Sequence, residues 1–496
     1  MNLLLPVLLP IIAGVLILLI KGFRKNKKSL HSAVTLILSA ELLLVWSILF
    51  SGGNLNLFSL TDRITISFTV DSVSRLFAGL TSIIWTLAGI YALSYMDHGH
   101  DQHRFFGFYL IVEGVLIGLD FSADLITMYV FYELMTLTSL PLVLHERTKE
   151  AVMAGLKYLF YSVAGAFMAL FGIFFLASTG CELGFVAGGS LMGIADTVLV
   201  GKEGVFLLAV CMLLIGFGTK AGMFPLHGWL PTAHPVAPAP ASAVLSGIIT
   251  KSGVLAIIRV IFFVVGADLI RGTWVQTVWI VLSLMTVFMG SMLAYKEPVF
   301  KKRLAYSTVS QVSYMLFGLS VLEPTAFIGA LSHVVFHSVI KNALFFVAGA
   351  VIVQTGWTRV EEMRGLGKVM PKTLAAYTLA SLALVGIPPA SGFVSKWYLA
   401  TGSLASDTGI WAFAGPVILL ISALLTAGYL LPVMINGFFP GQDFDENELK
   451  KRKLIGKEPS ACMLVPIVIL GAASIVLGCF PGGLIRMIEQ IAASLL

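Results

Sequence analysis

The chain has 496 residues, of which 58% are hydrophobic and only 12% are charged. Soluble proteins are on average about 45–50% apolar and about 25% charged, so this composition excludes an ordinary soluble enzyme and a disordered chain. The four cysteines form no CxxC pair, which argues against a disulfide framework, a zinc site or an iron–sulfur cluster.

Fourteen apolar segments follow one another along the chain, and most have the length of a helix that spans a bilayer. We predict them near residues 2–20, 31–50, 73–95, 106–121, 124–144, 152–178, 204–224, 241–264, 274–294, 304–320, 325–354, 373–387, 410–437 and 461–479. Shorter stretches at 226–236 and 391–403 are predicted half-helices that follow breaks in segments 7 and 12. The first segment is long and apolar without a small-residue cleavage site, so we expect a retained helix. The expected fold class is an all-α integral membrane protein.

The net charge of +6 is distributed unevenly over the loops. On one side of the predicted membrane the loops carry 21 Lys and Arg, and on the other they carry three, Arg63, Lys202 and Arg271. By the positive-inside rule, the side whose loops carry more Lys and Arg faces the cytoplasm. We therefore expect a multi-pass protein of the cell membrane with both termini outside. Spread over six loops, the positive charge does not favour a nucleic-acid surface.

Charged residues inside the apolar segments point to function, because a charge at the bilayer centre costs at least about 2.5–3.5 kcal/mol. Arg259 lies near a predicted helix end, so we expect it to snorkel to the interface. Lys157 either snorkels in the same way or lies between Glu133 and Lys220 in the pathway. The roles of Glu41 and Glu113 stay open. The full set comprises Lys157, Lys220, Lys251, Arg259, Lys341, Lys396, Glu41, Glu113 and Glu133.

Glu133 lies in the middle of FYELMTLTSL. It is either a protonated, inert carboxyl group or a proton-pathway carboxylate that pairs with a buried lysine. Lys220 ends an apolar run in GFGTKAGMFPLHGWLP, where Pro225 and Pro231 break the helix. Unwound backbone at membrane depth is tolerated where it lines protein or a wet cavity. Lys251 has small neighbours that permit close helix packing. A structural salt bridge is the alternative for both lysines.

Three ionisable side chains share one helix face in LSHVVFHSVIKNALFF, namely His333, His337 and Lys341 at i, i+4 and i+8. Two histidines with this spacing also occur in metal sites, but the acidic partner of the HExxH type is absent from this motif. We therefore expect a proton relay and no metal site.

The second break, GIPPASGFVSKW, places Pro388 before Lys396. Lys220 and Lys396 occupy corresponding positions in the two halves. The same spacing, counted from Glu133, reaches a position beside Ser310. Paired breaks in corresponding halves indicate a repeat-built transporter, and we expect two inverted five-helix repeats, helices 4–8 and 9–13. The predicted divisions are 1–105 for helices 1–3, 106–267 and 268–437 for the two repeats, and 438–496 for a cytoplasmic linker and the last helix.

The motifs FYELM, LKYLFYS, GTKAGMFPLHGWLPTAHPVAPAPASAVLSGIITKSG, LAYSTVSQVSYM, SHVVFHSVIKNALFF and GIPPASGFVSKW appear in this order. They resemble the antiporter-like subunits of respiratory complex I, Mrp-type Na+/H+ antiporters, the D-type chain above all, and membrane-bound hydrogenases. The resemblance covers roughly residues 125–400.

The resemblance implies a proton-translocating role for Glu133, Lys220, Lys251, His333, His337, Lys341 and Lys396, with Lys220 as the lysine partner of Glu133. We expect Lys157, His227, His234, Ser310, Pro225 and Pro388 to support that pathway. The expected function is translocation of protons, or H+/Na+ exchange, in a multisubunit complex. This chain is expected to hold no cofactor or redox active site of its own, and partner membrane and peripheral redox subunits are expected to hold the redox cofactors. A structural membrane anchor and a stand-alone solute carrier are the alternatives.

Overall fold

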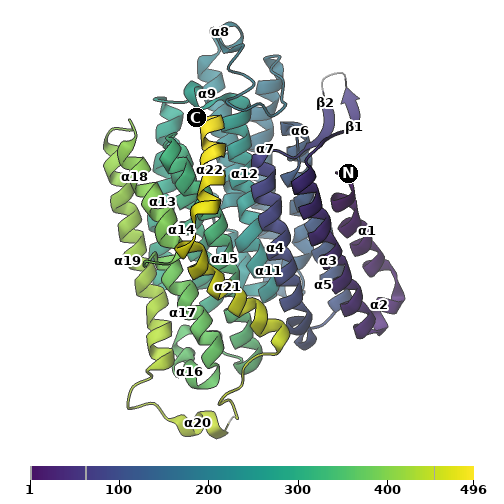
Figure 1. Cartoon of the computed structure of the whole chain (residues 1–496), viewed down its shortest axis with the longest axis vertical. Coiled ribbons are helices and arrows are strands. Elements are labelled where there is room, and N and C mark those ends of the chain that lie inside the picture. Colours follow the sequence, from purple (N-terminus) through teal and green to yellow (C-terminus); the bar gives the residue numbers. More distant parts are fainter. Residues whose placement is uncertain (1–2, 62–63, 452) are drawn as a thin grey trace.

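The computed structural model describes residues 3–61, 64–451 and 453–496. Its long helices run alongside one another as a bundle (Figure 1). The predicted all-α membrane class is confirmed apart from one small β-hairpin. Arg63 and Arg452, which contribute to the predicted loop charges, lie outside the described residues.

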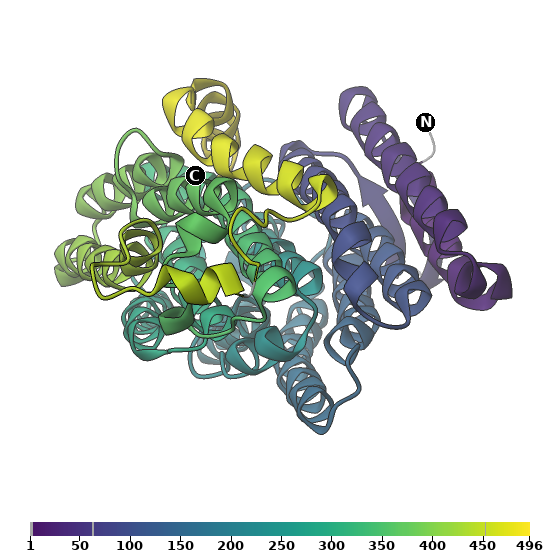
Figure 2. The same cartoon turned by 90° about the horizontal axis from the view of Figure 1, so that it is seen from below.

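The first part of the chain begins at one edge of the bundle and leads into its interior (Figures 1 and 2). It comprises α1 (Leu5–Leu19), α2 (Lys21–Lys25), α3 (Lys27–Ser51), β1 (Asn54–Thr61), β2 (Ile64–Thr69), α4 (Ser72–Tyr95) and α5 (Gln102–Asp120). The two strands pair antiparallel and connect α3 to α4. This hairpin was not predicted, although polar and apolar residues alternate from Asn54 to Leu57, which is a strand pattern.

The middle of the chain contributes the helices that surround the first break. These are α6 (Leu125–Val143), α7 (Lys149–Ser178), α8 (Ala195–Val198), α9 (Glu203–Ala221), α10 (Leu230–Val236), α11 (Ala239–Val244), α12 (Thr250–Arg259) and α13 (Trp274–Lys296). Two π-helical turns, Leu245–Ile249 and Val260–Val265, flank α12. Together with α11 they form one continuous, fully buried span, Ala239–Val265.

The last part contains α14 (Phe300–Ser320), α15 (Pro324–Thr355), α16 (Leu366–Val369), α17 (Pro371–Val385), α18 (Ser391–Ala405), α19 (Ile410–Phe438), α20 (Glu446–Lys451), α21 (Ala461–Cys479) and α22 (Gly482–Leu495). In Figure 1, α21 crosses the bundle obliquely and α22 rises beside it. The α22 helix was not predicted, and its Ile485, Ile488 and Ile491 are buried.

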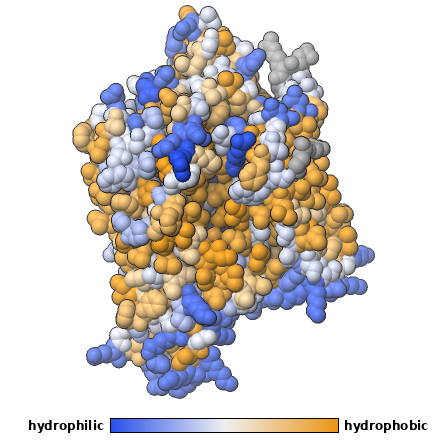
Figure 3. Space-filling model, in the orientation of Figure 1, coloured by the Kyte–Doolittle hydropathy of each residue, from blue (hydrophilic) through white to orange (hydrophobic). Residues whose placement is uncertain are grey.

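Among the described residues, ten helices are long and apolar enough to cross a membrane. The remaining predicted segments correspond to α1, α5, α14 and α17, which are shorter or less apolar. The molecular surface is mainly hydrophobic over the middle of the bundle and more hydrophilic toward its two ends (Figure 3). These features establish a multi-pass membrane protein.

Both predicted helix breaks are present. The α9 helix ends at Gly222 and α17 ends at Gly386, each with a left-handed backbone (φ +81° and +93°). Glycine is the residue that adopts this conformation without strain, so it terminates helices in this way. The chain resumes as α10 and α18, which correspond to the two predicted half-helices. Phe224–Pro225 and Pro388–Pro389 are cis peptide bonds.

Candidate functional site

Lys220 lies in the last turn of α9 and is fully buried. Its Nζ donates hydrogen bonds to Thr136 Oγ1 (2.9 Å), Ser162 Oγ (2.9 Å) and Tyr158 Oη (3.1 Å). An ammonium group has three donors, so these hydroxyl groups from α6 and α7 occupy all of them. The Tyr158 ring adds a cation–π contact, with its centroid 4.5 Å from Nζ. The first break therefore presents a buried ammonium group in a cage of neutral acceptors.

The expected Lys220–Glu133 ion pair is wrong as a direct contact. Within the described part of the chain, no salt bridge joins these two residues, and Glu133 Oε1 has no hydrogen-bond partner. Glu133 is half-buried on α6, one turn before Thr136. The three donors of the Lys220 ammonium group go to the hydroxyl cage instead. Glu133 stays close enough to influence Lys220 through its charge.

Lys251 lies on α12, directly after a π-helical turn. Its Nζ donates to the carbonyl oxygen of Ser246 (2.6 Å) and contacts Nδ1 of His337 on α15 (2.7 Å). The wider π turn alters the backbone hydrogen bonding at this point, and such turns are frequent at functional sites. A Cβ on Gly253 would lie 2.6 Å from the Phe217 carbonyl oxygen. The predicted close packing by small residues therefore brings α12 against α9.

The histidines of α15 continue from Lys251 in the order His337, then His333. Their ring centroids are 5.7 Å apart, and both residues are buried. Nδ1 of His333 lies 2.9 Å from the Ser395 hydroxyl on α18. The i, i+4 spacing therefore does place both rings on one buried face, between Lys251 and the second broken helix.

Lys396 follows Ser395 on α18 and is half-buried. Its Nζ donates to the carbonyl oxygens of Leu384 (2.6 Å) and Val385 (2.9 Å), at the end of α17 where the helix stops. Tyr314 of α14 lies between this lysine and the histidines. Its ring centroid is 5.3 Å from Lys396 Nζ and 5.6 Å from the His333 ring. The second break thus supplies backbone acceptors to its lysine, as unwound backbone at membrane depth can.

Lys341 lies beside this row. Its Nζ donates to Ser307 Oγ (2.7 Å) and to the Leu304 carbonyl oxygen (3.1 Å), both on α14. Ser307 also accepts a hydrogen bond from Tyr429 of α19 (2.6 Å). His337 and His333 lie between Lys251 and Ser395, and Lys341 contacts α14 beside them.

The supporting residues are divided between the two breaks and a separate cluster. Lys157 is half-buried on α7, with Nζ 5.9 Å from the Tyr161 ring centroid. His227 lies in the first break against Phe224, and His234 is buried against the Phe345 ring. Neither ring nitrogen of His234 has a hydrogen-bond partner within the described part of the chain.

Ser310 bonds to Ser291 (2.8 Å) and lies 3.2 Å from Ser422, in a hydroxyl cluster formed by α13, α14 and α19. Pro225 and Pro388 lie in the two cis peptides of the breaks.

Two cationic residues occupy positions that differ from those expected. Arg259 does not snorkel, since it is 1% exposed and forms a salt bridge with Asp71, which caps α4. Burial raises the pKa of Asp71, but the Arg259 charge and the hydrogen bonds from Arg259 and Ser74 outweigh it and hold the pKa below its usual 3.8. Lys301, assigned to a loop, is buried and donates to the Ala237 carbonyl oxygen.

Glu41 and Glu113 lie outside this row. Both are fully buried, on α3 and α5, and none of their carboxyl oxygens has a hydrogen-bond partner among the described residues.

Several side chains that complete the site were missed. Tyr158 and Ser162 lie within LKYLFYS, Ser307 and Tyr314 within YSTVSQVSY, and Ser395 directly before Lys396. Their position inside the polar motifs was the available signal. Tyr429 carried no such signal, because it lies in an otherwise apolar segment.

The fold and the site together define a class of protein. It is a multi-pass helical membrane protein in which buried or half-buried lysine and histidine side chains lie on α9, α12, α15 and α18, with hydroxyl, carbonyl and imidazole groups as their hydrogen-bond partners. Groups of three or more His, Cys, Asp or Glu that could hold a metal ion are absent from the described residues. Intramembrane ionisable residues of this kind mark ion pathways.

Comparison with known proteins identifies the family. Residues 122–425 match the family model described as NADH:quinone oxidoreductase/Mrp antiporter, TM, and residues 58–106 match NADH-Ubiquinone oxidoreductase (complex I), chain 5 N-terminus. The chain belongs to this NADH:quinone oxidoreductase/Mrp antiporter family, as the sequence motifs indicated.

Two relatives and one solved structure illustrate the similarity. The N-type subunit of NADH-quinone oxidoreductase from Desulforudis audaxviator is 33% identical, over 86% of this chain and 84% of the relative. The D-type subunit of the Na(+)/H(+) antiporter from Alkalihalophilus pseudofirmus is 30% identical over the same shares. The archaeal membrane-bound sulfane sulfur reductase contains a chain of the same fold, with a TM-score of 0.84, 20% identity and 99% of both chains covered.

Proposed function

We propose that this chain translocates protons along the row Lys220, Lys251, His337, His333 and Lys396. The observation that carries the proposal is the 2.7 Å contact between Lys251 Nζ and His337 Nδ1, inside a buried row that leads to the second helix break. A neutral imidazole can take a proton at one ring nitrogen and release it from the other. Ser395 and Tyr314 lie between His333 and Lys396 and would complete the connection.

The acceptors of the lysines suit proton transfer. Hydroxyl groups and backbone carbonyls can hold a buried ammonium group by accepting its hydrogen bonds. Because these acceptors are neutral, loss of the lysine proton leaves no unpaired negative charge on them, as it would on a carboxylate partner. Glu133 then acts as a nearby charge that favours the protonated form of Lys220. Lys341, with Ser307 and Tyr429, forms a branch from the row toward α14 and α19.

The driving energy is proposed to come from outside this chain. Partner antiporter-like and small membrane subunits, with peripheral redox subunits that hold the redox cofactors, would supply it, or an ion gradient would. Exchange of H+ with Na+ is the second candidate, because a relative of 30% identity is named as part of a Na(+)/H(+) antiporter. A purely structural anchor is disfavoured, since it would have no use for buried lysines of this cost.

We further propose fourteen transmembrane helices, in which α1, α5, α14 and the α17–α18 pair join the ten long apolar spans. Residues 106–267 and 268–437 would be the two inverted repeats, between helices 1–3 at 1–105 and the segment 438–496. The basic loops would face the cytoplasm in the cell membrane, with both termini outside. The support for the repeats is that each half has a helix break with a left-handed glycine and a buried or half-buried lysine.

The test is transport by the assembled complex in inside-out membrane vesicles. Lys220→Ala, Lys251→Ala and Lys396→Ala are each expected to abolish most of the pH gradient formed on energisation. Lys202→Ala, which removes an exposed lysine from the loop before α9, should leave it intact. Full pumping by all three buried-lysine variants would contradict the proposal. A pH gradient that forms only when Na+ is added would favour H+/Na+ exchange.

A further inference from the structure

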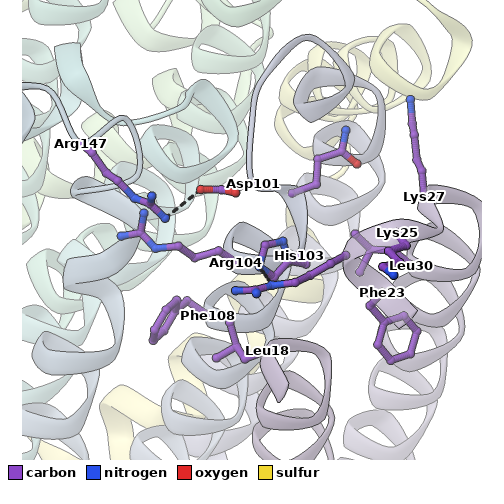
Figure 4. Close-up of a pocket in the computed structure, with 12 residues that line it drawn as sticks. Leu18, Phe23, Lys25, Lys27, Leu30, Asp101, His103, Arg104, Phe108 and Arg147 are labelled. Atoms are coloured by element: carbon purple, nitrogen blue, oxygen red, sulfur yellow. Dashed lines mark hydrogen bonds and ion pairs between the residues drawn. The ribbon is translucent and has the colours of Figure 1, made fainter. Parts of the chain in front are cut away.

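A large cavity lies away from the ion row, where α1, α2, α3 and α5 meet the loop after α6. Its volume is about 720 Å³. Five basic side chains line it, and they come from three regions that are far apart along the chain: Arg24, Lys25 and Lys27 in α2 and at the start of α3, Arg104 at the start of α5, and Arg147 in the loop after α6. Figure 4 shows Lys25, Lys27, Arg104 and Arg147 above Leu18 and Phe108.

Carboxylates neutralise only part of this charge. Arg147 pairs with Asp101 (2.8 Å) and Lys27 pairs with Asp97 (2.6 Å). Arg24 instead donates to the His103 ring (3.0 Å), and Arg104 donates to the His145 carbonyl oxygen (3.4 Å). Two guanidinium groups therefore face neutral acceptors in a cavity with an excess of positive charge. An anion is the complementary ligand, and guanidinium groups bind phosphate oxygens well.

The opposite side of the cavity is apolar. Leu18, Phe23, Leu30 and Phe108 line it. The exposed side of α1 carries further apolar residues, Ile12, Leu16 and Leu19. A free phosphate or sulfate ion would use the guanidinium groups alone, whereas a phospholipid would use both halves of this site.

The location also fits a lipid. The cavity lies at the end of the hydrophobic middle of the bundle, beside the hydrophilic end that contains α2 (Figures 1 and 3). This is the depth at which a phosphate headgroup meets its acyl chains. Basic pockets between transmembrane helices on the cytoplasmic side are sites where anionic lipid headgroups bind.

We propose that this cavity binds an anionic phospholipid, with its phosphate held by Arg24 and Arg104 and its acyl chains against Leu18, Phe23 and Phe108. The bound lipid would anchor the α1–α3 edge of the bundle at a defined depth. The site is separate from the proposed ion row, so either proposal can fail without the other.

The test measures lipid binding to the purified full-length chain in detergent by native mass spectrometry. Phosphatidylglycerol is the anionic probe, zwitterionic phosphatidylcholine the matched lipid, and inorganic phosphate the free anion. Each basic residue near an anionic headgroup contributes about 1 kcal/mol, and about 1.4 kcal/mol is a factor of ten. R24Q/R104Q should therefore weaken phosphatidylglycerol binding about thirtyfold and leave phosphatidylcholine binding unchanged.

Two control variants separate the site from net charge and from folding. K450Q/K451Q removes two exposed positive charges from α20, outside this cavity, and should bind phosphatidylglycerol like the wild type. R24K/R104K keeps the charge and should retain most of the affinity, which a merely misfolded cavity would not. Equal binding of the two lipids by the wild type would overturn the proposal, as would unchanged binding by R24Q/R104Q. Inorganic phosphate that displaces phosphatidylglycerol at equal concentration would show a small-anion site and would also overturn it.

Discussion

The buried lysines share one chemical feature: their hydrogen bonds go to neutral groups. Lys220 donates to hydroxyls, Lys341 to a hydroxyl and a carbonyl, and Lys396 to carbonyls, while Lys251 contacts a carbonyl and an imidazole. A carboxylate partner would hold the proton tightly, because loss of the proton would leave a buried negative charge unpaired. Neutral partners can accompany either protonation state, which is what a relay requires.

His337 offers the sharpest test at this scale, because its ring contacts Lys251. His337→Gln keeps a polar side chain but removes the two-nitrogen relay. A hydrogen bond to a charged group contributes about 1.5–3 kcal/mol, so the variant is expected to transport protons at least about tenfold more slowly. Initial rates of pH change in energised vesicles measure this effect.

The control for His337 is His98→Gln, an exposed histidine at the end of α4. It should transport at the wild-type rate. Wild-type transport by His337→Gln, at equal protein content in the vesicles, would remove the ring from the pathway.

At the scale of elements, the two broken helices place their lysines by different local means. Lys220 precedes its break and points into the α6–α7 hydroxyls, whereas Lys396 follows its break and points back to carbonyls that α17 leaves free at its end. Prolines and glycines made both breaks predictable. The direction of each lysine was not predictable, because it depends on which helices pack beside the break.

Gly386 is the element-scale test, since it ends α17 next to Lys396. In Gly386→Ala, the new Cβ would lie 3.0 Å from Lys396 Cδ, in addition to the left-handed strain of about 1–2 kcal/mol. We expect lower thermal stability and also slower proton transport, because the lysine must move. Thermal unfolding and vesicle transport are measured on the same preparations.

Gly356→Ala is the matched control. Gly356 ends α15 with a similar φ of +76°, but a Cβ there meets no atom within 4 Å. Gly356→Ala should lower the thermal stability by a similar amount and leave the rate of proton transport unchanged. Equal loss of transport in both variants would mean that strain alone, rather than the Lys396 contact, explains the effect.

At the scale of the whole molecule, charge asymmetry and bundle geometry agree. The loop that contains α20 lies at one end of the bundle and the region around α8 lies at the other (Figure 1). These ends carry the basic-rich and basic-poor loops, respectively, which predicts opposite sides of the membrane.

Cysteine labelling tests this arrangement. The exposed Cys462 and Cys479 are first replaced by Ser. Lys451→Cys on α20 should then react with an impermeant maleimide in inside-out vesicles only, and Lys202→Cys before α9 in right-side-out vesicles only. Reaction of both positions from the same side would contradict the proposed topology.

Local patterns in the sequence determined the membrane class, most spans, both helix breaks and the positions of the buried lysines. These properties follow from composition, periodicity and the backbone chemistry of Gly and Pro, all of which act over a few residues. The β1–β2 hairpin carried a local signal that the much stronger apolar segments on either side obscured.

Only the tertiary structure decided which groups meet. Packing of distant helices replaced the expected Lys220–Glu133 pair with a hydroxyl cage, set the order from Lys251 through His337 to His333, and brought Ser395 and Tyr314 between the histidines and Lys396. It also gathered basic residues from three distant regions of the chain around one cavity. Such contacts join residues far apart along the chain, so they depend on how the helices pack and not on any local pattern.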